Sequence, residues 1–248
     1  MNPRSILSLD YSSPCLAASR VAHYGCTGKG YILIFRDTVP FAVSHVFQLA
    51  RRMLDTTVSR LLAMWWNIRL GPRASFYGLP RFHKHPTATI TIAGGCTFRS
   101  AGWSNTVGIN RRCFVSAGRS GSVQIGRNCG FSGAVIAASK EIRIGDRVLV
   151  GANCTICDTD RHPLDAADRA CGVAAEAAVI DIGDDVFLGM NVVVLKGVRI
   201  GNSTVVAANS VVTRSLPSGV LAGGVPARPI KSLAGVMPAE SSCNEVPL

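Results

Sequence analysis

One histidine of the chain lies in a sequence context that suits proton transfer by its imidazole. His162 lies in the segment CDTDRHPLD, preceded by Asp158 and Asp160 and followed by Pro163. A neutral imidazole accepts a proton near neutral pH, and a positioned general base accelerates attack by a hydroxyl group by about 10²–10⁴-fold. We therefore take His162 as the candidate general base. Asp158 and Asp160 are either the groups that orient its ring or ordinary turn residues.

The chain around this histidine has a period of six residues. A 3.6-residue helix cannot keep one residue type facing inward at this spacing, and an alternating strand has a period of two. One short strand and one turn use six residues, and three such units close a triangular coil that stacks on the next at about 4.8 Å. The sequence therefore predicts an all-β fold of stacked parallel strands. The longest unbroken run of inward-facing residues is Ile182, Leu188, Val194, Ile200, Val206 and Val212.

Earlier copies of the repeat lead us to expect about five coils within residues 88–231. Glycine, asparagine or aspartate beside the aliphatic residues is expected to adopt positive φ at the turns. The earlier aliphatic positions are Ile144, Val150, Ile156 and Ile125, with looser copies at Ile92 and Val107. The turn candidates besides glycine are Asn128, Asp146, Asn153, Asp184, Asn191, Asn202 and Asn209.

The repeat is strongly interrupted once, at residues 157–181. This segment contains His162 and Pro163, is rich in aspartate and fits no hexad. Functional residues are commonly placed on loops extruded from a rigid scaffold. The interruption therefore favours a catalytic role for His162 over that of an ordinary surface histidine.

An α-helical appendage is predicted before the repeats, as an amphipathic helix and linker at residues 41–87. Apolar residues recur there at helical spacing with arginines among them, and Gly71-Pro72 ends the helix. Its apolar face either packs on the main domain or a neighbouring subunit, which we favour, or lies on a membrane surface. Residues 1–40 have little pattern beyond the short strand-like run YILIF, and residues 232–248 are expected to form a flexible tail.

Charge and cysteine content narrow the class of protein. The net charge is +11, and residues 1–85 hold 11 Lys/Arg against 3 Asp/Glu. No nucleic-acid-binding motif accompanies this charge, so a solvated basic face is favoured over nucleic-acid binding. Cys96, Cys129 and Cys154 occupy one repeating slot, which predicts buried thiols rather than disulfides. The odd cysteine count and the lack of a secretory or membrane-spanning segment predict a cytoplasmic protein, with attachment to the inner membrane face as a second interpretation.

These features together resemble the hexapeptide-repeat acyltransferases, in particular the sugar and polysaccharide O-acetyltransferases. The resemblance is carried by the repeats, by DTDRHPLD, and by a C-terminal run that ends in AGGVPARPIK, and it covers about residues 88–231. It implies a left-handed β-helix that forms a homotrimer, with acetyl-CoA as co-substrate in the groove between subunits. It implies no metal and no permanently bound cofactor. The implied acceptor is a hydroxyl group of a sugar or polysaccharide precursor.

The resemblance also implies roles for residues around that groove. The amide of Met190 is the implied oxyanion donor, while Gly189, Ala207 and Ala208 line the pantetheine arm of CoA. Phe187 stands where many relatives have Trp, which keeps an aromatic wall and loses the indole donor. The other implied contacts are Ser132 near the acetyl group, with an ordinary turn serine as the alternative, and Thr213, Arg214, Arg228 and Lys231 near the nucleotide.

Other functions account for the sequence less well. A γ-class carbonic anhydrase has the same prism but needs three histidine ligands, and the repeat region offers only His162. A structural repeat module of an assembly has no need of an extruded histidine loop. An acyltransferase that uses acyl-carrier protein as donor, or one that acetylates an antibiotic or other small molecule, is the alternative within the enzymes.

Overall fold

The computed structural model describes residues 28–233, so the expectations for residues 1–27 and 234–248 lie outside the described part. The chain divides into two compact units between Val46 and Phe47, inside helix α2 (Gly28–Trp65). The helix begins earlier than predicted, and the run YILIF belongs to it instead of forming a strand. None of the described helices is both long and apolar enough to cross a membrane.

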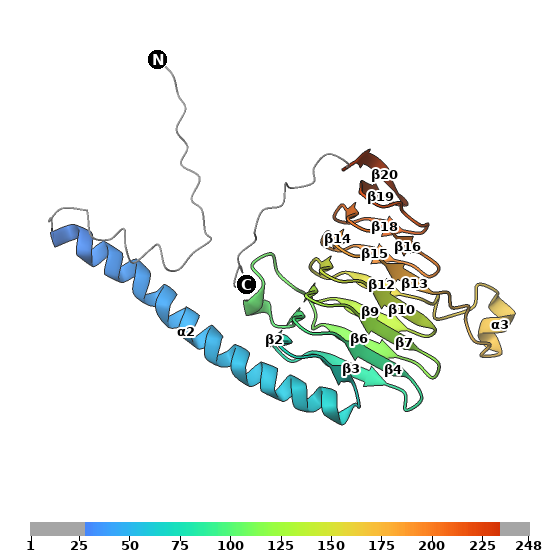
Figure 1. Cartoon of the computed structure of the whole chain (residues 1–248), viewed down its shortest axis with the longest axis horizontal. Helices are drawn as coiled ribbons and strands as arrows, with labels where there is room; N and C mark the ends of the chain where they lie inside the picture. The colour runs from blue at the N-terminus through green and yellow to red at the C-terminus, as the bar shows by residue number, and fades with distance from the viewer. Residues whose placement is uncertain (1–27, 234–248) are drawn as a thin grey trace, which may run out of the picture. The chain divides into compact units, whose positions relative to one another are not determined.

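The second unit is a stack of triangular coils whose strands form three sheets (Figure 1). Sheet 1 contains β1 (Arg69–Leu70), β4 (Thr89–Ile92), β7 (Ser122–Ile125), β10 (Glu141–Ile144), β13 (Ile180–Ile182) and β16 (Arg199–Ile200). Sheet 2 contains β2 (Ser75–Tyr77), β5 (Thr97–Arg99), β8 (Gly130–Ser132), β11 (Leu149–Val150), β14 (Phe187–Leu188), β17 (Val205–Val206), β19 (Val220–Gly224) and β20 (Ala227–Ser232). Sheet 3 contains β3 (Arg81–Lys84), β6 (Phe114–Ala117), β9 (Val135–Ala138), β12 (Thr155–Cys157), β15 (Val193–Val194) and β18 (Val211–Val212).

The chain visits sheets 1, 2 and 3 in turn, and the winding is that of a left-handed β-helix, as predicted. Inward residues of successive coils align in parallel register, for example Ile144 with Ile182 and Ile182 with Ile200. The described chain makes six coils and the first begins at β1, so the expected five coils from residue 88 missed one. Phe76 and Phe82 are inward residues of that first coil. Because these inward residues are aromatic, the six-residue spacing of aliphatic residues does not reveal the first coil.

The repeat glycines have a different physical role from the predicted one. Positive φ occurs three residues after the inward aliphatic residue, at Asn153, Asn191 and Asn209, but also at Arg147 and Asp185 where no turn residue was expected. The glycines that directly follow the aliphatic residues do not have positive φ. They are required because the next coil passes close by: a Cβ added at Gly189 would lie 2.6 Å from the amide nitrogen of Ala208.

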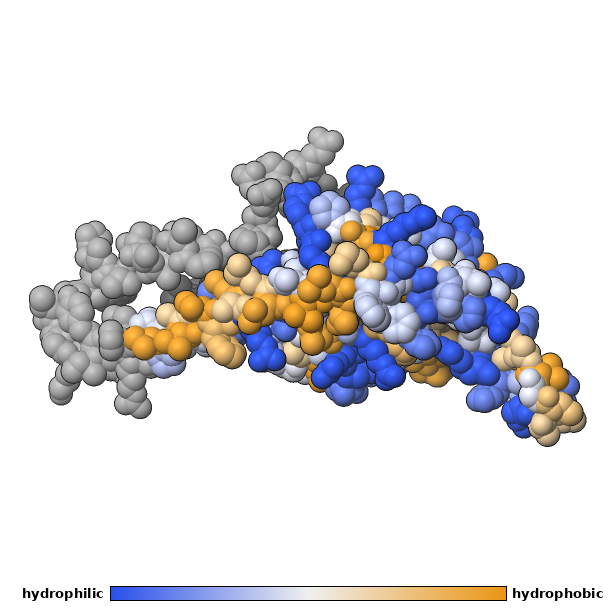
Figure 2. Space-filling view, turned by 90° about the horizontal axis from the view of Figure 1, so that it is seen from below, coloured by the Kyte–Doolittle hydropathy of each residue, from blue (hydrophilic) through white to orange (hydrophobic). Residues whose placement is uncertain are grey.

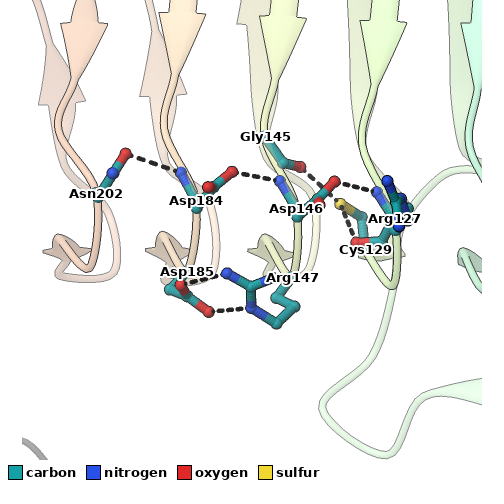
Figure 3. Close-up of polar contacts among 8 residues, drawn as sticks. All are labelled: Arg127, Cys129, Gly145, Asp146, Arg147, Asp184, Asp185 and Asn202. Carbon is teal, nitrogen blue, oxygen red and sulfur yellow. Dashed lines mark hydrogen bonds and ion pairs between the residues drawn. The ribbon is translucent and has the colours of Figure 1, made fainter.

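Carboxylate and amide side chains join the coils at the corner between sheets 1 and 2 (Figure 3). Asn202 accepts the backbone N–H of Asp184 at 3.0 Å, and Asp184 accepts that of Asp146 at 2.7 Å. Asp146 continues the ladder by accepting the N–H of Arg127 at 2.7 Å. These residues were predicted to have positive φ. Their side chains instead accept hydrogen bonds from backbone N–H groups of the preceding coil.

The cysteine prediction is confirmed. Cys96, Cys129 and Cys154 are free and buried, and each thiol donates to a glycine carbonyl of the following coil. Burial raises the pKa of the Cys154 thiol to about 11, which keeps it protonated at neutral pH. These thiols therefore act as small core residues with one satisfied donor.

Candidate functional site

An apolar groove runs along the corner between sheets 2 and 3, which we call the 2–3 corner. Its volume is about 400 Å³. It brings together six of the residues assigned by resemblance, from the third, fifth and sixth coils. Those residues are Ser132, Phe187, Gly189, Met190, Ala207 and Ala208, and the rest of the lining is Asn105, Val107, Gly151, Ala152, Val205 and Val206. A smooth apolar channel of this kind suits an extended chain such as the pantetheine arm of CoA.

Within the described residues, the wall of this groove presents free backbone donors at Ala152, Met190 and Ala208. The N–H of Gly189 bonds Val206 O at 2.8 Å, and the N–H of Asn191 bonds Ala152 O at 2.7 Å. Between them, the N–H of Met190 has no acceptor within residues 28–233. A fixed N–H at the edge of an apolar groove can stabilise a developing oxyanion without reorganisation.

A second extruded segment, residues 100–113, contributes to the groove, and sequence reasoning missed it. It leaves the stack between β5 and β6 and includes the short 3₁₀ helix η2 (Gly102–Ser104). Val107 was interpreted as part of a loose repeat, whereas it lies in this loop and lines the groove beside Asn105. The signal available was the polar, glycine-containing run GWSNTVGINRR, which separates two buried strands.

Hydrogen bonds fasten this loop to the coils. Arg99 donates to Ser104 O at 2.6 Å, and the N–H of Asn110 bonds the Asn153 side chain at 2.9 Å. Arg111 donates to the carbonyl of Gly133 and to the hydroxyl of Thr155. The groove wall formed by residues 105–107 is therefore held by the scaffold.

His162 lies at a different corner, on the predicted loop that follows β12. The loop carries the short helix α3 (Ala166–Ala170), and Figure 1 shows it on the side of the stack away from β14. His162 is exposed and makes no hydrogen bond or ion pair within the described residues. Its backbone is restrained on both sides, because the N–H of Arg161 bonds the Thr159 hydroxyl and Arg169 donates to Pro163 O. The imidazole is thus free on an ordered segment.

Asp158 closes the coil from which this loop leaves. Its side chain is buried, and its two oxygens accept the N–H groups of Ser139 and Lys140, each at 2.7 Å. The Asp158 carbonyl accepts the N–H of Ala178, so the two ends of the loop meet there. No hydrogen bond of the described chain joins Asp158 to His162. The turn-residue alternative therefore describes Asp158 better than the orienting role.

Asp160 is held by an ion pair instead of by the imidazole. The ammonium group of Lys196, in the following coil, lies 2.8 Å from Asp160 and 2.6 Å from Glu176. Asp160 leads into His162, and Glu176 lies on the returning arm of the loop. Asp160, followed by Glu176, raises the pKa of Lys196, so its positive charge is retained at neutral pH. Lys196 therefore bridges both arms at the base of the loop, a role that sequence reasoning did not identify.

The residues assigned to the nucleotide end of CoA fall in two places. Arg228 and Lys231 are exposed on β20, which pairs with β19 at the end of sheet 2. Thr213 and Arg214 are exposed just after β18, at the corner between sheets 3 and 1. None of the four lines the apolar groove of a single chain.

The charged face of sheet 1 has a larger hollow of about 680 Å³. Its charged lining is partly paired within the chain, since Arg199 lies 3.7 Å from Asp181 and Arg143 lies 3.2 Å from Glu141. It contains none of the residues assigned to catalysis or CoA binding. Within the described residues, no group of three or more His, Cys, Asp or Glu side chains is arranged to hold a metal ion.

Comparisons with known proteins identify hexapeptide repeats in two parts of the chain. Residues 180–214 match the family described as bacterial transferase hexapeptide (six repeats), and residues 141–157 match the hexapeptide repeat of succinyl-transferase. The galactoside O-acetyltransferase of Escherichia coli K12 is 39% identical over 92 residues, 37% of this chain and 44% of that protein. The galactoside O-acetyltransferase of Lactococcus lactis is 42% identical over 86 residues, 35% of this chain and 41% of that protein.

Among solved structures, the fold is similar to that of AntD, an N-acyltransferase from Bacillus cereus in complex with dTDP-4-amino-4,6-dideoxyglucose and coenzyme A. The TM-score is 0.54 at 16% identity, over 70% of this chain and 88% of that one. The fold of this chain is a left-handed β-helix, and the family matches identify hexapeptide repeats in residues 141–157 and 180–214. Its sequence relatives include galactoside O-acetyltransferases, and this chain matches less than half of their length.

Proposed function

We propose that this chain is an acetyl-CoA-dependent O-acetyltransferase that works as a homotrimer. Acetyl-CoA lies in the groove at the 2–3 corner, and a hydroxyl group of a sugar or polysaccharide precursor attacks its thioester. The observation that carries the proposal is the combination of an apolar groove presenting the free Met190 amide with an exposed, unpaired imidazole at His162. The galactoside O-acetyltransferases among the relatives support this acceptor class.

The need for more than one subunit follows from where these two groups lie. His162 follows β12 at the corner between sheets 3 and 1, whereas the groove lies at the 2–3 corner, so we assign the two parts of the site to different chains. A second prism, set beside the first, presents its residues 158–179 to the groove of its neighbour. Three such contacts close a ring, which is a common symmetry for soluble homo-oligomers.

The reaction is a direct transfer. His162 of one subunit removes the proton of the acceptor hydroxyl as its oxygen bonds the thioester carbonyl carbon. The carbonyl oxygen becomes an oxyanion and accepts a hydrogen bond from the Met190 N–H of the neighbouring subunit. The intermediate collapses by breaking the carbon–sulfur bond, and the proton held by His162 passes to the CoA thiolate. Ser132 and Phe187 border the acetyl end of the groove.

The cationic residues at the end of the stack are assigned to the phosphates of CoA. Arg228 and Lys231 extend from β20, and Thr213 and Arg214 lie in the turn after β18. Arginine binds phosphate through a fork of donors, while lysine acts as a point charge. The alternative donor, acyl-carrier protein, uses the same pantetheine arm without the adenine nucleotide. Activity with acyl-carrier protein and none with acetyl-CoA would therefore favour the alternative.

The experiment that tests the proposal replaces His162 by alanine. We expect kcat for acetyl transfer to fall about 10²–10⁴-fold, because the attacking hydroxyl loses its general base. CoA release is followed with a thiol reagent against galactosides, nucleotide sugars and antibiotics as acceptors. CoA binding and trimer mass are measured in parallel and should not change.

The matched control is His45→Ala, which removes an exposed histidine of α2. It should leave kcat unchanged. Equal turnover by the wild type and the His162→Ala variant would refute the assigned role.

A further inference from the structure

Helix α2 packs on the β-helix with a side that carries polar residues and, near the helix end, the buried Ala63 and the partly buried Leu62. Within the second unit, the hydroxyl of Thr56 accepts the N–H of Phe76 at 3.0 Å, and Asp55 accepts the N–H of Gly78 at 2.7 Å. Arg52 donates to the hydroxyl of Ser75 at 3.0 Å. These side chains satisfy the open edge of β2, whose outward backbone groups have no further coil to pair with. The polar side chains of this segment are thus directed at the stack.

The opposite side of the same segment is apolar and open to solvent. Phe47, Leu54, Leu61 and Trp65 are exposed by 62%, 66%, 56% and 85%, and they follow one another at spacings that place them on one helix face. Met53 and Met64 widen this face, and both are more than two-thirds exposed. Figure 2 shows it as an apolar band over α2 with hydrophilic residues on both sides. A continuous exposed apolar face of this kind marks an interaction surface.

The part of the chain that contains this face has an excess of positive charge. Residues 47–85 contain seven Lys/Arg and a single acidic residue, Asp55, whose side chain is buried against β2. Arg51, on the same helix, is half exposed, and Arg69 and Arg73 are exposed in the segment that follows. Arg51 lies 3.8 Å from Asp55, whereas no ion pair joins Arg69 or Arg73 to an acidic residue in the described chain. This part of the chain therefore combines an exposed apolar face with an excess of positive charge.

We propose that the face of α2 formed by Phe47, Leu54, Leu61 and Trp65 binds the surface of an anionic phospholipid bilayer. The apolar side chains enter the boundary between headgroups and acyl chains, where tryptophan and leucine are favoured, and the arginines meet the phosphate groups. A second copy of the same face offers the arginines only further arginines and no acidic partner. Charge complementarity therefore selects the lipid surface. The inference does not depend on acetyl transfer.

The test is flotation of the full chain with vesicles of phosphatidylcholine alone or mixed with phosphatidylglycerol. We expect the wild type to float with the mixed vesicles and not with phosphatidylcholine alone. The double variant Leu54→Glu/Leu61→Glu should lose about tenfold or more of its bound fraction, because two carboxylates then enter the apolar contact. The control Val173→Glu adds a carboxylate at an exposed apolar residue far along the chain and should float like the wild type.

Both leucines are exposed, so the double variant should keep the wild-type melting temperature, which is measured to show that it folds. Failure of the wild type to float with anionic vesicles, or equal flotation of the double variant, would overturn the proposal. Binding to both kinds of vesicle alike would contradict the role of the arginines. A smaller molecular mass of the double variant in lipid-free solution would show instead that the face joins copies of this chain.

Discussion

At the scale of single residues, positive φ and the lack of a side chain are required at two different positions of the repeat. The sequence pattern alone does not distinguish these two requirements. One position in each hexad turns the backbone left-handed, and residues as different as Asn191, Arg147 and Ser203 fill it. In several hexads, for example at Gly183 and Gly189, another position must lack a side chain because a neighbouring coil passes over it. The first requirement is local, whereas the second depends on a residue seventeen or more positions away. Composition alone therefore predicts the glycine but not its reason.

The exposed ion pair between Arg147 and Asp185 gives a pH-dependent prediction at this scale. Arg147 contacts both oxygens of Asp185 at 2.6 and 2.7 Å and lowers the pKa of Asp185 below its ordinary value of 3.8 (Figure 3). A lowered pKa in the folded state stabilises the protein above pH 3.8, and this contribution is lost as the pH falls through the folded-state pKa. Asp185→Asn keeps a residue that tolerates positive φ and removes only the charge.

We expect Asp185→Asn to lower the free energy of unfolding at pH 7 by at most about 1 kcal/mol, because the pair is exposed and screened. Thermal unfolding of both proteins from pH 7 to pH 2 measures the difference, which should shrink at the acidic end and in high salt. A difference that stays constant over this range would contradict the assignment to the ion pair.

At the scale of elements, the loop that carries His162 was predictable and its fastening was not. The interruption of a strict period reveals a loop in any single sequence. Lys196 and Glu176 are separated by twenty positions, and the local sequence does not predict that they form an ion pair at the base of the loop. The same holds for residues 100–113, where an irregular early repeat obscured a second loop. Partners contributed by the next coil become visible only once the stack is built.

The ion pairs of Lys196 give a testable prediction for the loop that carries His162. Lys196→Met should leave Asp160 and Glu176 without their shared partner, and the two arms of the loop then separate. We expect faster hydrogen exchange of the amides in residues 158–179 and a lower kcat, with an unchanged KM for acetyl-CoA because the groove lies at another corner. Lys196→Arg should restore part of kcat.

The matched control is Lys140→Met, at an exposed lysine without an ion pair in the described chain. It should leave exchange and kcat as in the wild type. A rise in KM for acetyl-CoA without faster exchange in Lys196→Met would place Lys196 in donor binding, against the positioning role.

At the scale of the whole molecule, the sequence predicted the β-helix because a period of six has few physical solutions. It did not predict the first coil, whose inward phenylalanines break the aliphatic pattern. It also did not predict which side of α2 packs on the stack. Helical spacing identifies an amphipathic helix, but it does not say which side meets the scaffold. Here the packed side includes Asp55 and Thr56, which accept backbone N–H groups at the open edge of β2, and the buried Ala63.

A shared site predicts complementation between two inactive variants. His162→Ala leaves the groove intact, and Ala208→Trp fills the groove but leaves the imidazole. In trimers that contain both variants, an intact groove can face an intact His162 of the adjacent subunit. We expect co-expression to restore a measurable fraction of wild-type kcat, while the proposed trimers of either variant alone keep only the residual activity of that variant. Absence of recovery in mixed trimers of confirmed composition would mean that one chain supplies both parts.

The hydrogen bonds between α2 and β2, and the antiparallel pairing of β20 on β19, have a further consequence. A stack of parallel coils is in principle a template for unlimited growth, since each terminal rung resembles an interior one. Here one terminal rung is covered by a helix and the other by a strand running in the opposite direction. We expect these contacts at both ends of sheet 2 to oppose head-to-tail joining of molecules into fibres.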